Sequence, residues 1–293
     1  MSRVIVFDVE HGFCAFVKSP TGRTLMIDCG RKAKFSPAIY VLQNELGGTR
    51  LTELVVSHPH DDHIEDVETI SSRVEPEILY RQQYDWEQVK QAEGDYENLD
   101  RYRIWQQTYN APAPVRDWGM AITIFRLTPV EAYAINPNNY INNSGVVVVV
   151  TITGTQFSEK FVFGADVETD GWDALLLKPG FRAAVANTHF FIVPHHGHCS
   201  GFSTALYEAM GRPILNLVSV RSGDDDVDSR YGSAEYARGL VMGSERRYSV
   251  TTRTDGSIFI DVDESGRFLI YTRDLADNDP LAAAVAAFLG GMR

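Results

Sequence analysis

Short apolar runs recur along the chain, and turn-forming Gly, Pro, Asp and Asn residues separate them. The runs are rich in Val, Ile and Phe, which is typical of buried strands. They predict strands at 4–7, 13–18, 24–28, 52–57, 121–127, 145–153, 160–164, 190–193, 215–220, 248–252, 257–262 and 267–272. Apolar residues at three- and four-residue intervals predict helices at 36–47, 64–72, 86–92, 95–108, 170–177, 202–210, 232–242 and 280–289. This order predicts an α/β (α+β) fold in which two stacked sheets lie between layers of helices, an αββα sandwich.

The length favours a single domain. A two-sheet sandwich with an insertion can place 293 residues around one core, so the whole span 1–293 is interpreted as one unit. The segment 81–118 carries three of the four tryptophans in a polar setting and is predicted to be a helical insertion that forms one wall of a cleft. Residues 280–293 are predicted to form a C-terminal helix or tail.

Composition also favours one cellular setting. No window approaches the roughly 18 consecutive apolar residues of a membrane-spanning helix. The first residues lead directly into a strand, without the pattern of a secretory signal. Three cysteines are an odd and sparse set that suits a reducing compartment. We therefore expect a cytoplasmic protein without a membrane span.

Three of the eight histidines lie within six residues, in the run Ser57-His58-Pro59-His60-Asp61-Asp62-His63 at the end of the predicted strand 52–57. Neutral imidazoles and carboxylates are ligands for borderline divalent cations such as Zn²⁺ or Mn²⁺. In an extended backbone His58 and His60 are predicted to face one ion, and Asp62 and His63 a second. The sequence thus predicts two divalent metal ions, Zn²⁺ or Mn²⁺, as cofactors.

This run resembles the second motif of the metallo-β-lactamase superfamily, His-x-His-x-Asp-His. Five other segments are similar, in order, to motifs of the ComEC/Rec2-related branch of that superfamily: Phe7-Asp8-Val9-Glu10-His11-Gly12, the strand ending Ile27-Asp28-Cys29-Gly30, Asn142-Asn143-Ser144-Gly145, Phe163-Gly164-Ala165-Asp166, and Val193-Pro194-His195-His196-Gly197. The resemblance covers, with gaps, residues from about 4 to 260. It implies a sandwich of two mixed sheets.

The resemblance also implies roles for residues outside the run. Asp166 is expected to bridge both ions, and either His195 or His196 to be the late ligand, with the order of the motif favouring His196. Asp28 is expected to support a ligand by hydrogen bonding. Asn143 and Ser144 stand where other members place a third-motif histidine, and they are expected to lie just behind the ligands.

Two segments depart from the branch. Glu10-His11-Gly12-Phe13 replaces the usual Gly-Gln-Gly-Asp, and His198 stands where a serine usually follows His-His-Gly. His11 and His198 are therefore candidates for direct catalytic roles, beside Asp62 and His63, although an exposed imidazole without function is the alternative for each.

The predicted reaction is hydrolysis by a metal-bound hydroxide, because two divalent ions lower the pKa of a bound water and polarise the scissile group. The absence of a third-motif histidine and the branch resemblance favour a phosphodiesterase or nuclease. A net charge of −12 opposes broad nucleic-acid binding, although the two ions supply local positive charge. Two alternatives stay open. One is a hydrolase of small esters, lactones or amides. The other is a partner-regulated component of a larger assembly, in which 281–289 docks on another chain or a second copy.

Overall fold

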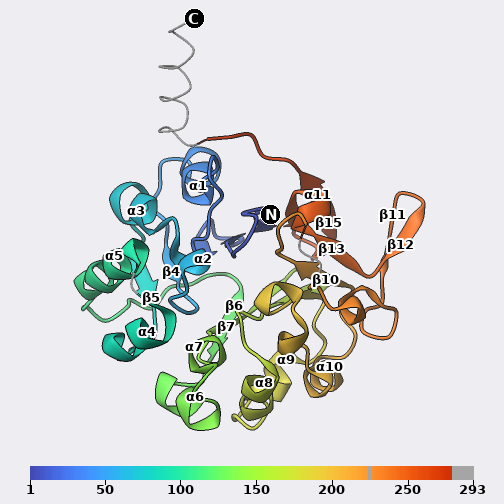
Figure 1. The fold of residues 1–293 in the computed structure, drawn as a ribbon. Coiled ribbons are helices and arrows are strands. Elements are labelled where there is room, and N and C mark those ends of the chain that lie inside the picture. The colour runs from blue at the N-terminus through green and yellow to red at the C-terminus, as the bar shows by residue number, and fades with distance from the viewer. Residues whose placement is uncertain (95, 224–225, 279–293) are drawn as a thin grey trace, which may run out of the picture.

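The computed structural model describes residues 1–94, 96–223 and 226–278. Two mixed sheets lie at its centre, and helices flank them (Figure 1). The predicted αββα sandwich of two mixed sheets is therefore confirmed. The helical tail predicted at 280–289 lies outside the described residues.

The first sheet has the strand order β15-β14-β1-β2-β3-β4-β5. Its antiparallel part ends at β3, which pairs in parallel with β4, and β4 pairs in parallel with β5. The strands are β1 (Ser2–Val6), β2 (Ala15–Lys18), β3 (Thr24–Ile27), β4 (Glu53–Val55), β5 (Ile78–Tyr80), β14 (Ser257–Val262) and β15 (Phe268–Arg273).

The second sheet has the order β13-β10-β9-β8-β7-β6. Strands β8, β9, β10 and β13 are parallel to one another, whereas β6, β7 and β8 form an antiparallel meander. Its strands are β6 (Ala121–Phe125), β7 (Val147–Thr153), β8 (Ser158–Phe163), β9 (Phe190–Ile192), β10 (Leu215–Val218) and β13 (Ser249–Thr251). A separate hairpin joins β11 (Leu240–Met242) to β12 (Glu245–Arg247).

The helices fall into two groups along the chain (Figure 1). The first group is α1 (Pro37–Asn44), α2 (Asp61–Ile64), α3 (Val67–Thr69), η1 (Ile70–Val74), α4 (Trp86–Glu93), α5 (Glu97–Trp105) and η2 (Gln106–Thr108). The second is α6 (Pro129–Ile135), α7 (Tyr140–Asn143), α8 (Thr169–Leu175), α9 (Phe181–Val185), η3 (His195–Gly197), η4 (Cys199–Gly201), α10 (Thr204–Met210), η5 (Ser229–Gly232) and α11 (Thr252–Asp255).

Alternation along the strands divides the core into two layers. In β1, Val4 and Val6 pack between the two sheets, whereas Ile5 faces the helices. In β8, Phe161 and Phe163 pack between the sheets and Val162 faces the helices. Because successive side chains of a strand point to opposite faces, burial on both faces requires runs that are apolar throughout. That is why these strands were recognisable from composition.

One predicted element is wrong, and several short ones, among them β5, α6 and α9, were not predicted. The helix expected at 232–242 is absent, because Gly239 has a φ of +75° and the chain then enters the β11–β12 hairpin. Strand β5 has only three residues, too few to show a period. Helix α9 is similarly short. Helix α6 begins with a Thr128–Glu131 capping box, a signal that was present in the sequence.

A carboxylate on the short strand β4 makes the stability of the fold depend on pH. Burial raises the pKa of Glu53 to about 7. In the unfolded chain a glutamate titrates near about 4.3, so the folded state is favoured most below that pH and loses stability as the pH rises toward 7. We expect Glu53→Gln to raise the free energy of unfolding at pH 8 by about 1–2 kcal/mol, after allowance for partial exposure.

Urea unfolding of metal-free protein at pH 8 and near pH 4 tests this expectation. Near pH 4 Glu53 is largely protonated in both states, and the variant should nearly match the wild type. An equal effect at both pH values would show that packing, not charge burial, sets the difference.

Every helix in the described part of the chain is too short or too polar to span a lipid bilayer.

Candidate metal centre

The predicted site residues follow the carboxyl ends of strands in both sheets. Asp28 follows β3, the run from His58 to His63 follows β4, Asp166 follows β8, and His196 follows β9. Parallel pairing of β3 with β4, and of β8 with β9, brings each pair of strand ends to one edge of its sheet. Loops at such an edge are a usual position for binding sites in open α/β sheets.

Imidazole nitrogens and carboxylate oxygens converge at this edge. His58, His63 and Asp166 form a buried group whose ligand atoms lie within 4.8 Å of one another. His11, Asp62 and His196 form a second group by the same measure, on a more exposed side. The groups adjoin, since Nε2 of His196 lies 3.1 Å from Asp62 Oδ2 and 3.6 Å from Asp166 Oδ2.

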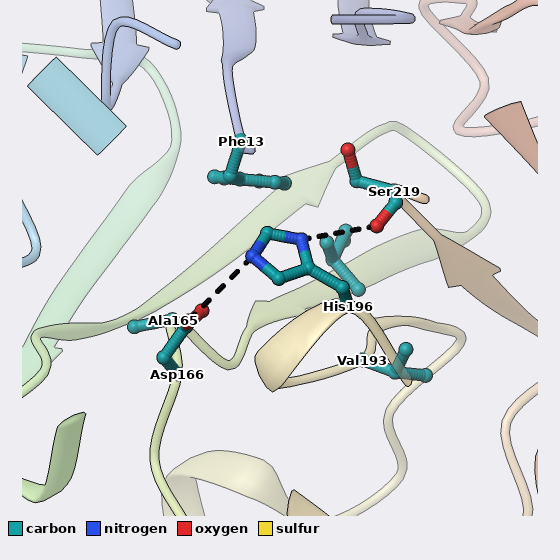
Figure 2. Close-up of a pocket in the computed structure, with 7 residues that line it drawn as sticks. Phe13, Ala165, Asp166, Val193, His196 and Ser219 are labelled. Atoms are coloured by element: carbon teal, nitrogen blue, oxygen red, sulfur yellow. Dashed lines mark hydrogen bonds and ion pairs between the residues drawn. The ribbon is translucent and has the colours of Figure 1, made fainter. Parts of the chain in front are cut away.

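The orientation of the rings fits metal ligation. The Nδ1 atom of His63 lies 2.7 Å from Asp28 Oδ2, and that of His196 lies 3.1 Å from the carbonyl oxygen of Ser219 (Figure 2). In the neutral ring each Nδ1 atom therefore keeps the proton, which leaves a lone pair on Nε2 for a metal ion. Both Nε2 atoms are buried and make no hydrogen bond of acceptable geometry.

The spacing of these donors also suits shared ions. Nε2 of His63 lies 3.3 Å from Asp166 Oδ1, and Nε2 of His58 lies 3.1 Å from Nδ1 of His60. Two donors about 2.1 Å from one ion, and about 90–110° apart around it, lie about 3.0–3.4 Å from each other. The donor set therefore fits two divalent ions.

Asp28 supports the ligand loop through hydrogen bonds. Its carboxylate accepts hydrogen bonds from the backbone N–H and the hydroxyl of Ser57, both at 2.6 Å, in addition to its contact with His63. The residue is fully buried and has a φ of +59°. The ring of His63 is therefore fixed in tautomer and direction, as a supporting carboxylate would do.

Charges in the cluster shift the pKa values of its members in opposite directions. Burial, reinforced by His63 and His60, lowers the pKa of His58 well below its ordinary value. Burial opposes the charged form of His63, but the carboxylates of Asp166 and Asp62 raise the pKa of that imidazole. His63 and His196 in turn lower the pKa of the Asp62 and Asp166 carboxyls, although burial acts in the opposite direction. The carboxylates are thus ionised, as metal ligands must be.

Backbone strain is concentrated around the site. Glu10, Asp28, Ala165, His195 and His196 all have φ between +49° and +62°. Left-handed backbone costs non-glycine residues free energy and persists where the surroundings impose it, often at functional sites. Here the left-handed residues change the direction of the loops that follow the strands, so that these loops approach the cluster.

The helices between β5 and β6 contact the ligand loop. Oε1 of Glu93, at the end of α4, lies 3.2 Å from Nε2 of His60. The hydroxyl of Tyr96 donates to the carbonyl oxygen of Pro59. The amide of Asn98 donates to Asp61 Oδ1 at 2.9 Å. The span predicted as an insertion thus contains helices that hold the loop, although His60 joins neither group of three.

A cleft of about 560 Å³ opens beside these residues. It is lined by His11, His60, Asp61, Asp62, Glu65, Glu93 and Tyr96.

His195 and His198 lie together, beside the cluster and outside both groups. Nδ1 of His195 lies 3.0 Å from Ser200 Oγ, and Nδ1 of His198 lies 2.9 Å from the same oxygen. His195 is also 3.5 Å from Oε1 of Glu168. Of the two competing histidines, His196 alone points its Nε2 at Asp62 and Asp166.

Asn143 and Ser144 shape the loops behind the cluster. The side chain of Asn143 accepts from the backbone N–H of Glu168 and donates to Asp170 Oδ1 at 2.7 Å. The hydroxyl of Ser144 lies 2.9 Å from the hydroxyl of Tyr84. Asn143 therefore supports the segment just after Asp166.

Several supporting residues were not expected from the sequence. Ser57, Glu93, Ser200 and Ser219 each contact an imidazole of the site. Ser57 was recognisable, because it directly precedes His58. Ser200 lies only five residues after His195, whereas Glu93 and Ser219 come from distant segments, and only the fold shows their proximity.

The chain matches a known protein family and is similar to several solved structures. The model of the metallo-beta-lactamase superfamily matches residues 7–207. No curated protein matches the chain. Among solved structures, the metallo hydrolase Igni18 of Ignicoccus hospitalis is 11% identical, with 93% of this chain and 100% of that chain covered and a TM-score of 0.44.

Two further structures are similar at the same low level. The long form RNase Z from yeast is 11% identical, with 84% of this chain and 41% of that chain covered and a TM-score of 0.40. The subclass B3 enzyme MEM-A1 from a soil metagenome is 13% identical, with 64% and 75% covered and a TM-score of 0.37. The family match spans more than half of the chain, and the buried His/Asp cluster lies within it. The chain belongs to the metallo-beta-lactamase superfamily.

Proposed function

We propose that the protein is a dinuclear metal-dependent hydrolase of small molecules that carry an ester, lactone or amide bond. When bound, the two ions supply activation of water and polarisation of the scissile carbonyl. The ligands are His58, His60, Asp62, His63, Asp166 and His196. The coarser assignment, a metallo-hydrolase with a buried His/Asp site, rests on the family and the cluster.

The acidic lining of the cleft is the observation that favours a small substrate over a nucleic acid. Asp61, Glu65 and Glu93 line it together with Asp62, and no Lys or Arg does so among the residues described. Proteins that bind a nucleic-acid backbone neutralise phosphates with Lys and Arg. A polyanionic chain would instead meet three carboxylates beyond the metal ligands.

An apolar side chain beside the ligands also favours a carbonyl substrate. Phe13 lines a small cavity with Asp166 and His196 (Figure 2), and its ring centroid is 6.2 Å from that of His63. The ComEC/Rec2-related branch places an aspartate at this position. Phe13 therefore places an apolar ring, and no charge, beside the ligands.

Phosphodiester hydrolysis is the second candidate. Asn143 and Ser144 stand in place of a third-motif histidine, so the ion near His58 and His60 has fewer protein ligands and more room for a phosphate oxygen. The motif resemblance to the ComEC/Rec2-related branch supports the same reaction. Both arguments fit a small phosphodiester better than a polymer, because of the acidic cleft.

A metal analysis with a substrate panel tests the proposal. Full-length protein purified without added metal, then loaded with Zn²⁺ or Mn²⁺, should hold two ions per chain. It should hydrolyse p-nitrophenyl acetate or a γ-lactone faster than bis-p-nitrophenyl phosphate, and a chelator should abolish turnover. One ion per chain, or turnover of the phosphodiester alone, would contradict it.

The double variant Asp61→Asn/Glu65→Gln provides an internal control for the role of cleft charge. Removing two carboxylates should raise kcat/KM for bis-p-nitrophenyl phosphate about threefold to tenfold, because like charges a few ångströms apart repel. Turnover of the neutral ester should change little. Equal effects on both substrates would show that the cleft charge does not select the substrate.

A further inference from the structure

We propose that His11 is a direct ligand of the more exposed metal ion, together with Asp62 and His196. This inference rests on the two-ion site proposed above. His11 belongs to the motif-one loop, which contributes no imidazole in the pattern that the chain otherwise resembles.

The position of the imidazole supports ligation. Nε2 of His11 lies 3.7 Å from Asp62 Oδ2, and its ring centroid is 5.1 Å from that of His196. The first distance is too long for a hydrogen bond. It is close to the separation of two donors that share an ion, about 3.0–3.4 Å, and a small rotation of the half-exposed ring closes the difference.

The backbone, more than a flexible side chain, sets this proximity. The N–H of Phe13 donates to the carbonyl oxygen of Asp62 at 3.2 Å, and Ser219 Oγ donates to the carbonyl oxygen of Gly12 at 2.8 Å. A Cβ atom at Gly12, whose φ is +120°, would lie 2.4 Å from the carbonyl oxygen of Asp62. The loop therefore lies directly against the residue that His11 faces.

The two groups of ligands differ in solvent exposure. His58, His63 and Asp166 are buried, whereas the side chain of His11 is 53% exposed and lines the cleft. An imidazole at that position closes the solvent side of the second group and leaves the cleft side for substrate. Compared with the superfamily motifs, the chain has Asn143 where an imidazole would bind the first ion, and it has the additional imidazole of His11 beside the second. The first ion therefore has one ligand fewer and the second has one more.

Stepwise metal binding tests the assignment. Metal-free full-length protein is titrated with Zn²⁺ in competition with a chromophoric chelator, for the wild type, His11→Ala and Glu10→Gln. We expect His11→Ala to weaken one of the two dissociation constants at least about 100-fold, beyond the loss typical of a supporting residue, and to leave the other within about threefold. Glu10→Gln changes the charge of the same loop and should keep both constants.

Two further measurements exclude an indirect effect. The melting temperature of the metal-free protein should be equal in all three proteins, since the side chain of His11 is half exposed. In ¹⁵N-labelled wild type, the Nε2 resonance of His11 should shift when the second equivalent of Zn²⁺ is added.

The outcomes separate this inference from the proposed function. If the wild type binds two ions and His11→Ala binds both as tightly, the inference is wrong and the proposed function stands. Weaker binding without a shift of the His11 resonance also overturns it, because His11 would then act through Asp62. If the wild type does not bind two ions, the proposed function fails as well.

Discussion

Asp62→Ala is expected to lower kcat/KM by at least about 1,000-fold in metal-loaded protein, while the fold stays intact. Asp62 lies 3.1 Å from Nε2 of His196 and 3.8 Å from Nε2 of His63, so its removal takes a carboxylate from the centre of the second group. Loss of the several kcal/mol that a well-held ion contributes to transition-state stabilisation corresponds to a rate loss of about this size. Steady-state kinetics on the substrate identified by the panel measure it.

The fold should tolerate this change because Asp62 lies in the short helix α2, outside the apolar core. We expect a shift in melting temperature of only a few degrees in metal-free protein, on the order of 1 kcal/mol. Asp173→Ala, which removes an exposed carboxylate on α8, is the matched control and should retain full activity. Turnover of Asp62→Ala near that of the control would remove Asp62 from the site.

The parts of the site that could be predicted obey local rules. A buried strand brings the residues just after it to a sheet edge, and the run from His58 to His63 carries its ligands within six residues. Asp28 and Asp166 come after strands in the same way. Apolar runs and the turn residues between them placed these strands along the chain, so the order of the motifs was visible before any contact was known.

The remaining parts depend on long-range contacts. Glu93 approaches His60 only because α4 packs against the ligand loop, and Ser219 reaches His196 from the end of β10. Nothing local in either segment indicates these partners. The acidic cleft has the same origin, since Glu65 follows α2 and Glu93 ends α4. Net charge could not show that the carboxylates gather beside the metal ligands.

The failed helix at 232–242 shows the limit of periodicity. Tyr236 and Leu240 recur at a helical interval, but Gly239 between them adopts a left-handed φ. A Cβ atom there would lie 2.8 Å from the ring of Tyr248, so the turn and its packing require glycine. Three-residue strands such as β11 carry too little pattern to compete with a chance helical spacing.

The adjacent histidines after β9 give the other large expected effect. His196 directs Nε2 at Asp62 and Asp166. The carbonyl oxygen of Ser219 fixes its ring from the other side, and Figure 2 shows the contacts with Asp166 and Ser219. His195 turns instead to Ser200 and Glu168. The two side chains therefore have different tasks, although they are neighbours in the chain and share a left-handed backbone.

His196→Ala should lose the second ion, so that elemental analysis finds about one equivalent after dialysis and turnover falls by at least about 1,000-fold. His195→Ala should keep both ions and lose only about 10–100-fold in rate, the range observed when a residue that supports a site is removed. Comparing the two variants in parallel makes each the control for the other, because both remove an imidazole from the same short turn. If His195→Ala loses the ion and His196→Ala retains it, the late ligand is His195, and the loop must rearrange when metal binds.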